Sequence, residues 1–359
     1  MKRTAVVILN WNTKDYLREF LPPLIESLEG CDAEVVVADN ASTDGSVEML
    51  EEEFPDIFTI ALDSNYGFTG GYDRAFAQIL DRDGAPEYLV LLNSDILVGE
   101  HWLEALVSFM DSHKDCAVCG PKILALGKTG SSWQKTDRFE YAGAAGGYLD
   151  RYGFPFCRGR VLSMTEADCG QYDSAPKRVF WISGACMMTR ADVWSGLGGL
   201  DESFFAHMEE IDYCWRAALE GRSIFMVPES SVWHVGGGTL SRDSAFKLKL
   251  NYRNSLLMLE KNLAASVGNK RASTLLRRRI KIDNLTRIIY LLTGKKPSAD
   301  AVKEAHAEFE AMRGAIRKSA PGQRPEGWLN MNIIIQFALK GKRIFKYIRR
   351  YETEHENRH

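Results

Sequence analysis

Short apolar runs recur along the first 120 residues, and a segment with helical periodicity follows each of them. The apolar runs lie at residues 4–9, 34–38, 58–62, 88–92 and 116–120. Continuous runs of this length are typical of strands buried on both faces. The helical segments between them lie at residues 14–28, 46–54, 68–80 and 101–112. This alternation predicts an α/β fold with a doubly wound, mainly parallel, Rossmann-like sheet.

The pattern changes twice further along the chain. Residues 125–178 are rich in Gly and aromatic residues with little periodicity, and we expect them to form a long excursion over the active face. Regular patterns return at residues 179–189, 190–196, 209–220 and 223–227. The remainder is almost entirely helical, with segments at 244–263, 270–292, 298–318 and 329–351. We therefore divide the chain into a sheet-bearing domain, residues 1–240, and a helical C-terminal extension, residues 241–359.

Charge separates the same two parts. The net charge of the 359 residues is only −3, from 45 Lys and Arg against 48 Asp and Glu. Residues 241–359 hold 26 of the basic and 11 of the acidic residues, which leaves 19 basic and 37 acidic residues for 1–240. An acidic part suits a metal site, whereas a basic part suits an anionic partner such as a membrane surface, a lipid diphosphate or nucleic acid.

The cysteines and the apolar segments of the sequence predict the cellular compartment of the protein. Seven cysteines without zinc-ribbon spacing favour buried free thiols in a reducing compartment. The apolar run after Lys2 and Arg3 stops at Asn10, too early for a signal peptide. No stretch approaches the roughly 20 apolar residues of a spanning helix. We expect a cytoplasmic protein, soluble or peripherally attached to the inner face of the membrane.

Polar side chains follow three of the predicted strands directly. They are Asn10 and Asn12, Asp39 and Asn40, and Asn93, Ser94 and Asp95. Ligands bind at the carboxyl ends of strands in such sheets. Asp95 could hold Mg²⁺ or Mn²⁺ together with diphosphate oxygens, or could instead cap the helix that begins near Gly99. Asp39 could accept hydrogen bonds from a base or ribose, or could form an Asx-turn, with Asp44 as the helix cap.

Two further motifs could carry chemistry. Glu209, Glu210 and Asp212 crowd the start of a predicted helix, where neighbouring carboxylates raise one another's pKa and one could act as a general base. The alternative is that these acids only complement the helix dipole. His234 stands beside a Gly-rich loop and could bind a metal or a diphosphate, or be structural.

Taken together and in this order, the motifs resemble the family 2 glycosyltransferases, which have the nucleotide-sugar-binding fold called GT-A. The matching segments are VVILNWN (6–12), VVADNASTDGS (36–46), NYGFTGG (65–71), LLNSD (91–95), GGLDESFF (198–205) with EEID (209–212), and WH (233–234). They cover roughly residues 4–240 and are most similar to a rhamnosyltransferase-like branch of bacterial cell-surface polysaccharide synthesis. The run KLNYRNSLL (249–257) also resembles that branch.

The resemblance implies a role for each matching residue. Asp95 would be the last residue of the metal-binding DxD motif, with Asn93 at its first position in place of the commoner Asp, and His234 would lie near the metal and diphosphate. Glu210 would be the catalytic base, a role that Glu209 or Asp212 could share. The implied nucleotide-binding residues are Asn10, Asn12, Asp39, Asn40, Gly67, Phe68, Gly71, Asn93 and Ser94.

These roles predict an inverting transferase that moves rhamnose or another hexose from a dTDP- or UDP-sugar to a hydroxyl of a glycan or polyprenyl-diphosphate-linked acceptor. Two alternatives are a catalytically degenerate nucleotide-sugar-binding module and a sugar nucleotidyltransferase. The second would need a Gly-rich, Arg-containing loop after the first strand, which the sequence after Asn10 lacks. The basic, apolar segments 339–350 and 277–281 could bind an anionic membrane, remain solvated, or form a homodimer contact. We expect no nucleic-acid partner.

Overall fold

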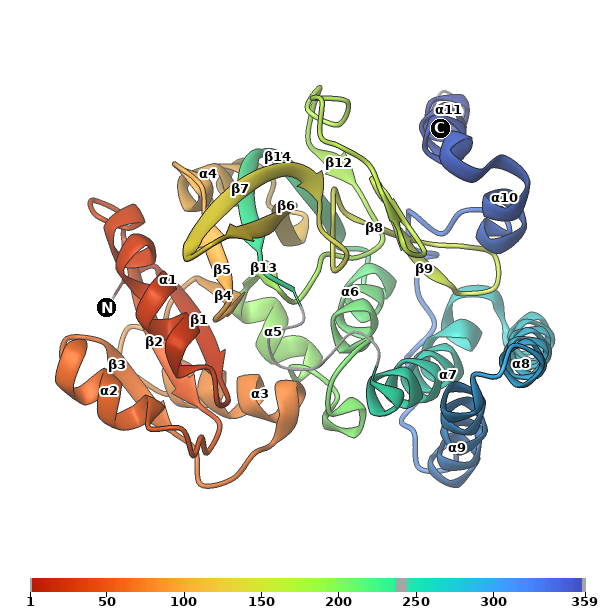
Figure 1. The fold of residues 1–359 in the computed structure, drawn as a ribbon, viewed down its shortest axis with the longest axis horizontal. Coiled ribbons are helices and arrows are strands. Elements are labelled where there is room, and N and C mark those ends of the chain that lie inside the picture. The colour runs from red at the N-terminus through yellow and green to blue at the C-terminus, as the bar shows by residue number, and fades with distance from the viewer. Residues whose placement is uncertain (1, 237–243, 357–359) are drawn as a thin grey trace.

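The protein is built around one large mixed sheet (Figure 1). The computed structural model describes residues 2–236 and 244–356. The ten-stranded sheet has the order β12-β14-β6-β13-β4-β1-β2-β3, with β5 paired to β14 and β7 paired to β6. Its strands are β1 Thr4–Asn10, β2 Ala33–Asp39, β3 Phe58–Ala61, β4 Tyr88–Asn93, β5 Ile96–Val98, β6 Cys116–Thr129, β7 Ser132–Phe139, β12 Lys177–Arg178, β13 Cys186–Arg190 and β14 Ser223–His234.

The prediction of a mainly parallel sheet is confirmed. Strands β3, β2, β1 and β4 run parallel to one another, and β14 runs parallel to β6. Strand β13 is antiparallel to both of its neighbours, β4 and β6. The carboxyl ends of β1, β2 and β4 therefore meet at one edge of the sheet, where the polar residues were expected.

Helices cover both faces of the sheet. They are α1 Lys14–Ser27, α2 Ser46–Glu53, α3 Gly67–Leu80, α4 Trp102–Ser112, α5 Ala191–Leu197 and α6 Glu209–Leu219. Alternate residues of β1 point to opposite faces: Val6 packs with α1, α2 and α4, whereas Val7 packs with α3, α5 and α6. This division explains why the strands read as continuous apolar runs.

Residues 125–178 contain more order than the weak periodicity predicts. The hairpin of β6 and β7 is followed by a separate sheet of order β11-β10-β9-β8. Its strands are β8 Gly147–Leu149, β9 Pro155–Cys157, β10 Arg160–Val161 and β11 Met164–Thr165. The small sheet is tied to the large one because Gly147 N donates to Trp181 O at 3.0 Å, and Phe180 N donates to Gly147 O at 2.8 Å. Such pairing between distant segments leaves little local periodicity.

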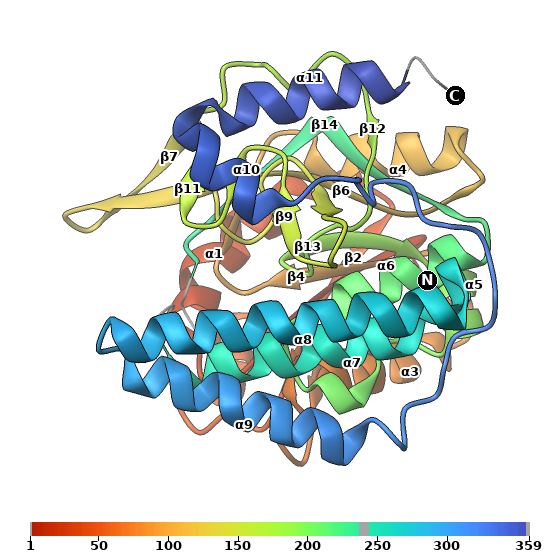
Figure 2. The same ribbon diagram turned by 90° about the vertical axis from the view of Figure 1, so that its right-hand side faces the viewer.

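The C-terminal part is helical, as expected. Its helices are α7 Ala245–Val267, α8 Asn269–Leu292, α9 Lys296–Met312, α10 Ile333–Lys340 and α11 Ile344–Glu356. Helices α7, α8 and α9 pack against one another as a three-helix bundle (Figure 2). The prediction of a single helix over 329–351 is wrong, because Gly341 has a positive φ of 49° and separates α10 from α11. Among the described helices, none is long and apolar enough to cross a bilayer.

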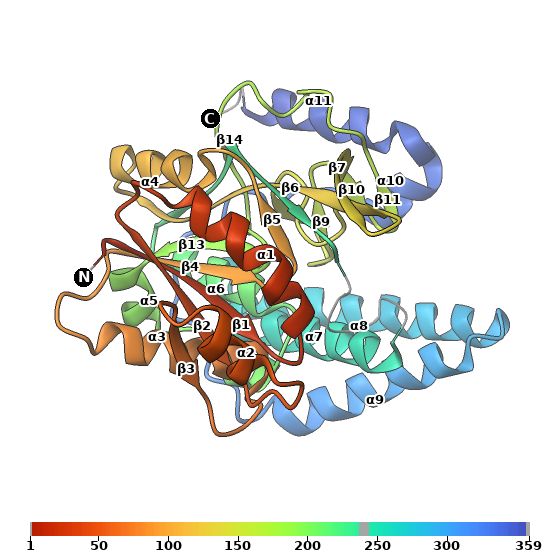
Figure 3. The same cartoon turned by 60° about the vertical axis from the view of Figure 1, so that its left-hand side comes forward.

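Helices α10 and α11 lie above the small sheet, while the bundle of α7, α8 and α9 lies below it (Figure 3). The apolar face of α11 is buried through Ile344 and Ile348. Ion pairs join the same helix to the preceding region, Glu352 with Arg158 at 3.1 Å and Arg349 with Glu166 at 2.7 Å. The apolar side of α11 is thus occupied by contacts within the protein.

Candidate active site

Two asparagines and one aspartate organise the ends of β1 and β2. Asn10 and Asp39 are register partners, and the Asn10 amide donates to Asp39 Oδ1 at 2.6 Å and to Ser42 Oγ at 3.0 Å. Ser42 N donates to the second Asp39 oxygen at 2.8 Å, so the predicted Asx-turn is present. Asn12 holds the same loop, because its Oδ1 accepts from Thr43 N at 2.7 Å. Asp39 is therefore held in a fixed orientation at the sheet edge.

The Gly-rich turn before α3 lies next to this loop. The Asn40 amide donates to Gly67 O at 3.0 Å, and its Oδ1 accepts from Tyr66 N at 3.0 Å. Gly67 has a φ of +70°, and a Cβ on Gly71 would lie 2.7 Å from the Leu9 side chain. Both glycines are required for α3 to start this close to β1.

The ends of β4 and β14 bring Asn93, Asp95 and His234 together, as the sequence predicts. His234 Nε2 lies 3.0 Å from Asp95 Oδ1 and 3.3 Å from Asn93 Nδ2. Ser94 faces away from this group and its Oγ lies 2.8 Å from Thr13 Oγ1. The alternative that Asp95 caps the next helix is wrong, because α4 begins at Trp102 and Asp95 faces His234. Residues 237–243 of the Gly-rich loop, and the proposed boundary at 240, lie outside the described residues.

A second carboxylate, Glu140, completes the surroundings of His234. Its Oε2 lies 3.4 Å from His234 Nδ1, and both side chains are buried. Sequence reasoning missed Glu140 because it stands in the irregular region and has no motif. Burial alone would lower the pKa of His234, but the charges and hydrogen bonds of Asp95 and Glu140 outweigh it and raise that pKa to about 10.

The same group of side chains fits part of a divalent metal site. Within residues 2–236 and 244–356, no three His, Cys, Asp or Glu side chains converge as a complete metal site. Asp95 and His234 nevertheless supply a carboxylate and an imidazole at one point, and substrate phosphates commonly provide further ligands. The two carboxylates that attract a proton to His234 would attract a cation for the same reason.

Glu209 and Glu210 open α6, where Glu209 is buried and Glu210 is half-buried. Oε2 of each has no hydrogen-bond partner among the described residues. Burial raises the pKa of Glu210 to about 7, and burial together with the charge of Glu210 raises the pKa of Glu209 well above its usual range. A carboxyl group that titrates near neutral pH is suited to accept a proton from a substrate hydroxyl.

Gly184 connects Glu210 with the nucleotide side of the site. A Cβ at Gly184 would lie 2.9 Å from the Phe68 ring and 3.8 Å from Glu210 Cβ. Glu210 and Phe68, two predicted site residues that are distant in sequence, therefore flank the same narrow space. The sequence gives only one signal for Gly184, a glycine inside the regular segment predicted at residues 179–189, of which the structure forms a strand only from Cys186.

Asp212 does not share this environment, which corrects its assignment as a candidate base. Its Oδ2 accepts from Arg216 Nε at 2.8 Å and from Lys261 Nζ at 2.9 Å. Its Oδ1 accepts from Asn262 Nδ2 at 2.7 Å. Both oxygens of this fully buried carboxylate are occupied, and its charge is paired with two cations. Asp212 therefore joins α6 to α7.

The loop that precedes α6 is strained and is held from α7. Phe205, His207 and Met208 have φ values of 64°, 72° and 74°. Phe205 O accepts from Phe68 N at 2.8 Å, which ties the loop to the start of α3. On the other side, the Asn254 amide contacts the carbonyl oxygens of Phe204, Ala206 and His207 at 2.9, 2.8 and 2.8 Å. The segment KLNYRNSLL thus supports the helix that carries Glu210.

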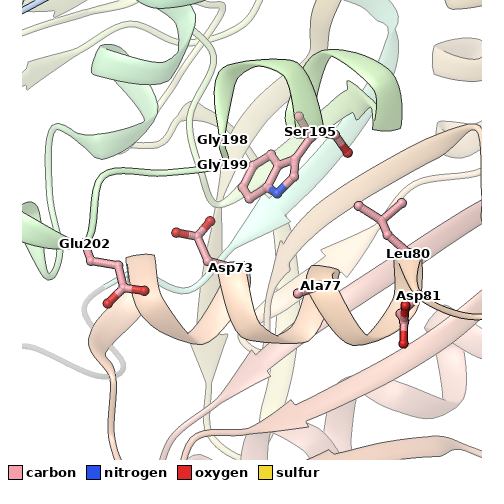
Figure 4. A pocket seen from close by; sticks show the side chains of 9 residues that line it. Asp73, Ala77, Leu80, Asp81, Ser195, Gly198, Gly199 and Glu202 are labelled. Carbon is pink, nitrogen blue, oxygen red and sulfur yellow. The ribbon is translucent and has the colours of Figure 1, made fainter.

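A separate hollow of about 560 Å³ lies between α3 and α5 (Figure 4). Asp73 of α3 and Glu202 of the segment after α5 line it, as does Trp194. None of the predicted site residues lines this hollow. The polar edge of the sheet, rather than this hollow, is the candidate active site.

The fold is that of the GT-A glycosyltransferases. The solved structure of GalNAc-T7 with UDP, GalNAc and Mn²⁺ superposes with a TM-score of 0.53 at 16% identity, over 72% of this chain and 48% of that one. The mannosyltransferase PcManGT from Pyrobaculum calidifontis, in complex with GDP-Man and Mn²⁺, gives 0.50 at 13% identity, over 86% and 87%. These likenesses concern the fold.

Sequence comparison finds a family match in the first half of the chain and relatives over most of its length. Residues 5–167 match the family model described as glycosyl transferase family 2. The N-acetylglucosaminyl-diphospho-decaprenol L-rhamnosyltransferase of Mycobacterium tuberculosis is 25% identical over 260 residues, 71% of this chain and 83% of the relative. The low-salt glycan biosynthesis hexosyltransferase Agl10 of Haloferax volcanii is 25% identical over 272 residues, 76% and 80%.

Proposed function

We propose that the protein is an inverting glycosyltransferase that uses a nucleoside-diphosphate sugar, with Glu210 as the general base. The observation that carries this proposal is the buried Glu210 carboxyl, which has a pKa of about 7 and shares a narrow space with Phe68 at Gly184. Glu210 would take the proton of the acceptor hydroxyl as that oxygen attacks the anomeric carbon. One displacement inverts the anomeric centre, and the nucleoside diphosphate leaves.

The donor would lie along the polar edge of the sheet. Asp39, held by Asn10, would bind the base or ribose, and the turn at Gly67 allows close approach of the nucleotide to the backbone. Asp95 and His234 would hold Mg²⁺ or Mn²⁺, the latter being the ion named with both GT-A neighbours. A divalent ion there would neutralise charge on the departing diphosphate.

The acceptor proposal follows from the relatives. The mycobacterial relative is named for an acceptor that carries a polyprenyl diphosphate and for transfer of L-rhamnose. We infer by analogy a polyprenyl-diphosphate-linked or glycan acceptor, a dTDP- or UDP-linked rhamnose or other hexose as donor, and a role in cell-surface polysaccharide synthesis. The basic C-terminal part would face this acceptor.

A lipid-linked acceptor requires access to a membrane, and helix α8 offers the surface for it. Exposed apolar side chains recur with helical spacing on its last two turns: Leu285, Ile288, Ile289 and Leu292. Exposed basic residues precede and follow this stripe along the chain: Arg277, Arg278 and Lys281 come before it, and Lys295 and Lys296 come after it. An apolar stripe flanked by cations is typical of helices that lie on anionic membranes.

Two segments singled out from the sequence contribute less to this surface. Arg279 is buried against Asp283 at 3.0 Å, and the apolar face of α11 is covered. Leu339 of α10 stays exposed at 75%. We propose a cytoplasmic enzyme bound peripherally through α8. Binding to anionic but not neutral liposomes, weakened in the double variant Leu285→Ser/Leu292→Ser, would support this attachment; equal binding by the variant would contradict it.

The first test of the enzymatic proposal is calorimetric titration of UDP, dTDP and GDP, with and without Mn²⁺ or Mg²⁺. We expect metal-dependent binding of UDP or dTDP that is lost in Asp95→Ala and retained in the control Asp83→Ala, which removes an exposed carboxylate in the turn before β4. Absence of binding under every condition would favour a degenerate module. Formation of a nucleotide sugar from a sugar phosphate and a nucleoside triphosphate would favour a nucleotidyltransferase.

A further inference from the structure

Arg160 in β10 is an almost fully buried cation that has no carboxylate partner among the described residues. Its exposure is 9%, and Nε is buried without a hydrogen-bond partner. Among the described residues, no carboxylate lies within ion-pair distance of its guanidinium, although the neighbouring Arg158 pairs with Glu352 at 3.1 Å. Burying an unpaired charge costs several kcal/mol, on the order of a whole domain's margin of stability. An arginine kept in this state indicates an anion that arrives from outside.

Arg160 is connected to the candidate active site through Tyr141 and Glu140. Its guanidinium carbon lies 4.3 Å from the centre of the Tyr141 ring, and Tyr141 directly follows Glu140, which contacts His234. Strand pairing places Arg160 opposite Cys157. Burial raises the pKa of the Cys157 thiol, the charge of Arg160 and a hydrogen bond from it oppose this rise, and the charges of Glu140 and Glu210 add to it. The charges of Arg160, Glu140 and Glu210 therefore all act on the buried sulfur of Cys157.

The contacts of Arg160 leave its binding edge available. A ring that lies against a guanidinium restrains it but uses none of its five N–H donors, and the Cys157 thiol occupies at most one of them. Tyr141 is itself 43% exposed, so the stack lies at an opening toward solvent. A fixed guanidinium plane with free donors is suited to bidentate recognition of phosphate oxygens.

We propose that Arg160, held by Tyr141, forms a binding site for a substrate diphosphate between the His234 group and Glu210. This inference rests on the proposed function, since that reaction brings diphosphates to this edge. The diphosphate could belong to the nucleotide sugar or to a lipid-linked acceptor, and the chemistry of recognition is the same for both. Arg160 is not among the residues that the sequence motifs indicate.

The test compares Arg160→Gln and Arg160→Lys with the wild type and with Arg138→Gln, which removes an equal charge from a nearby exposed position. Inorganic pyrophosphate and the nucleoside diphosphates are titrated by calorimetry. The KM is then measured for a short-chain alkyl-diphosphate-linked sugar acceptor and for the same sugar linked to the alkyl chain without phosphate. Circular dichroism and thermal unfolding show that each variant is folded, and Arg160→Lys keeps the charge if Arg160→Gln does not fold.

We expect Arg160→Gln to weaken pyrophosphate binding at least about tenfold, as loss of one charge-assisted bidentate contact predicts, with a smaller loss in Arg160→Lys and none in Arg138→Gln. A parallel loss of nucleoside diphosphate affinity assigns the site to the donor. A rise in KM confined to the diphosphate-linked acceptor assigns it to the acceptor. Unchanged pyrophosphate binding and unchanged KM would overturn the inference. Wild-type protein that binds pyrophosphate but no nucleotide would refute the proposed function and leave the anion site standing.

Discussion

Replacement of Asn254 by Leu tests whether α7 positions the catalytic base. Leu has the same branching and the same number of side-chain heavy atoms as Asn, although it is larger, and it donates no hydrogen bond. The substitution removes the amide that contacts the carbonyl oxygens of Phe204, Ala206 and His207 at 2.8–2.9 Å. These carbonyls belong to the strained loop directly before Glu209 and Glu210, so any relaxation of the loop moves the start of α6.

The magnitude follows from the strain in that loop. Three residues other than glycine with positive φ cost roughly 1 kcal/mol each, or about 3 kcal/mol together. The two hydrogens of the Asn254 amide contribute about 1 kcal/mol each, and leaving buried carbonyl groups without a donor costs about 1 kcal/mol more. The hydrogen-bond stabilisation that the substitution removes is thus about equal to the conformational strain of the loop. We expect the loop to leave its strained conformation, and because the released strain offsets part of the lost hydrogen bonding, we expect the free energy of unfolding to fall by less than about 3 kcal/mol.

The assay separates positioning from simple loss of stability. At a temperature where the variant is fully folded, kcat should fall at least about tenfold, since 1.4 kcal/mol of misplacement corresponds to that factor. The matched control is Asn251→Leu, because the Asn251 amide donates only to Lys247 O of its own helix at 2.8 Å. Lower stability with unchanged kcat in Asn254→Leu, or equal loss of kcat in both variants, would refute the reasoning.

Three further outcomes are expected from the site. Glu210→Gln should lower kcat by about 10²–10⁴ while nucleotide affinity, measured by calorimetry, stays unchanged; a smaller effect than in Glu209→Gln would point to the wrong base. The wild-type rate should rise with pH through about 7 and fall below it, because a pKa raised to that value leaves Glu210 protonated in acid; a rate that stays constant down to pH 5 would contradict this. Asp212→Asn leaves Lys261 and Arg216 facing a neutral amide, so chemical denaturation should show a loss of about 3 kcal/mol, and unchanged stability would exclude the structural role given to Asp212.

The sequence determined the architecture and one edge of the site. Strands such as β1 and β4 are buried on both faces, so their apolar runs were visible without any knowledge of their neighbours. Because parallel strands align their carboxyl ends, the polar residues after them had to gather, and Asn10 with Asp39 and Asn93 with His234 do so. These features depend on local periodicity and on a rule of sheet topology, which is why a single chain reveals them.

Only the tertiary structure decided which residues surround that edge. Glu140 reaches His234, Arg160 and Glu210 both affect the Cys157 thiol, and Asn254 supports the loop before α6 through contacts between distant segments that leave no periodic trace. The role of Asp212 also depends on packing, because this residue of the acidic motif forms an ion pair with Lys261 of another helix. Spacing along a chain records which way a side chain faces on its own element; the partner it meets, and therefore its charge state and role, depends on how the elements pack.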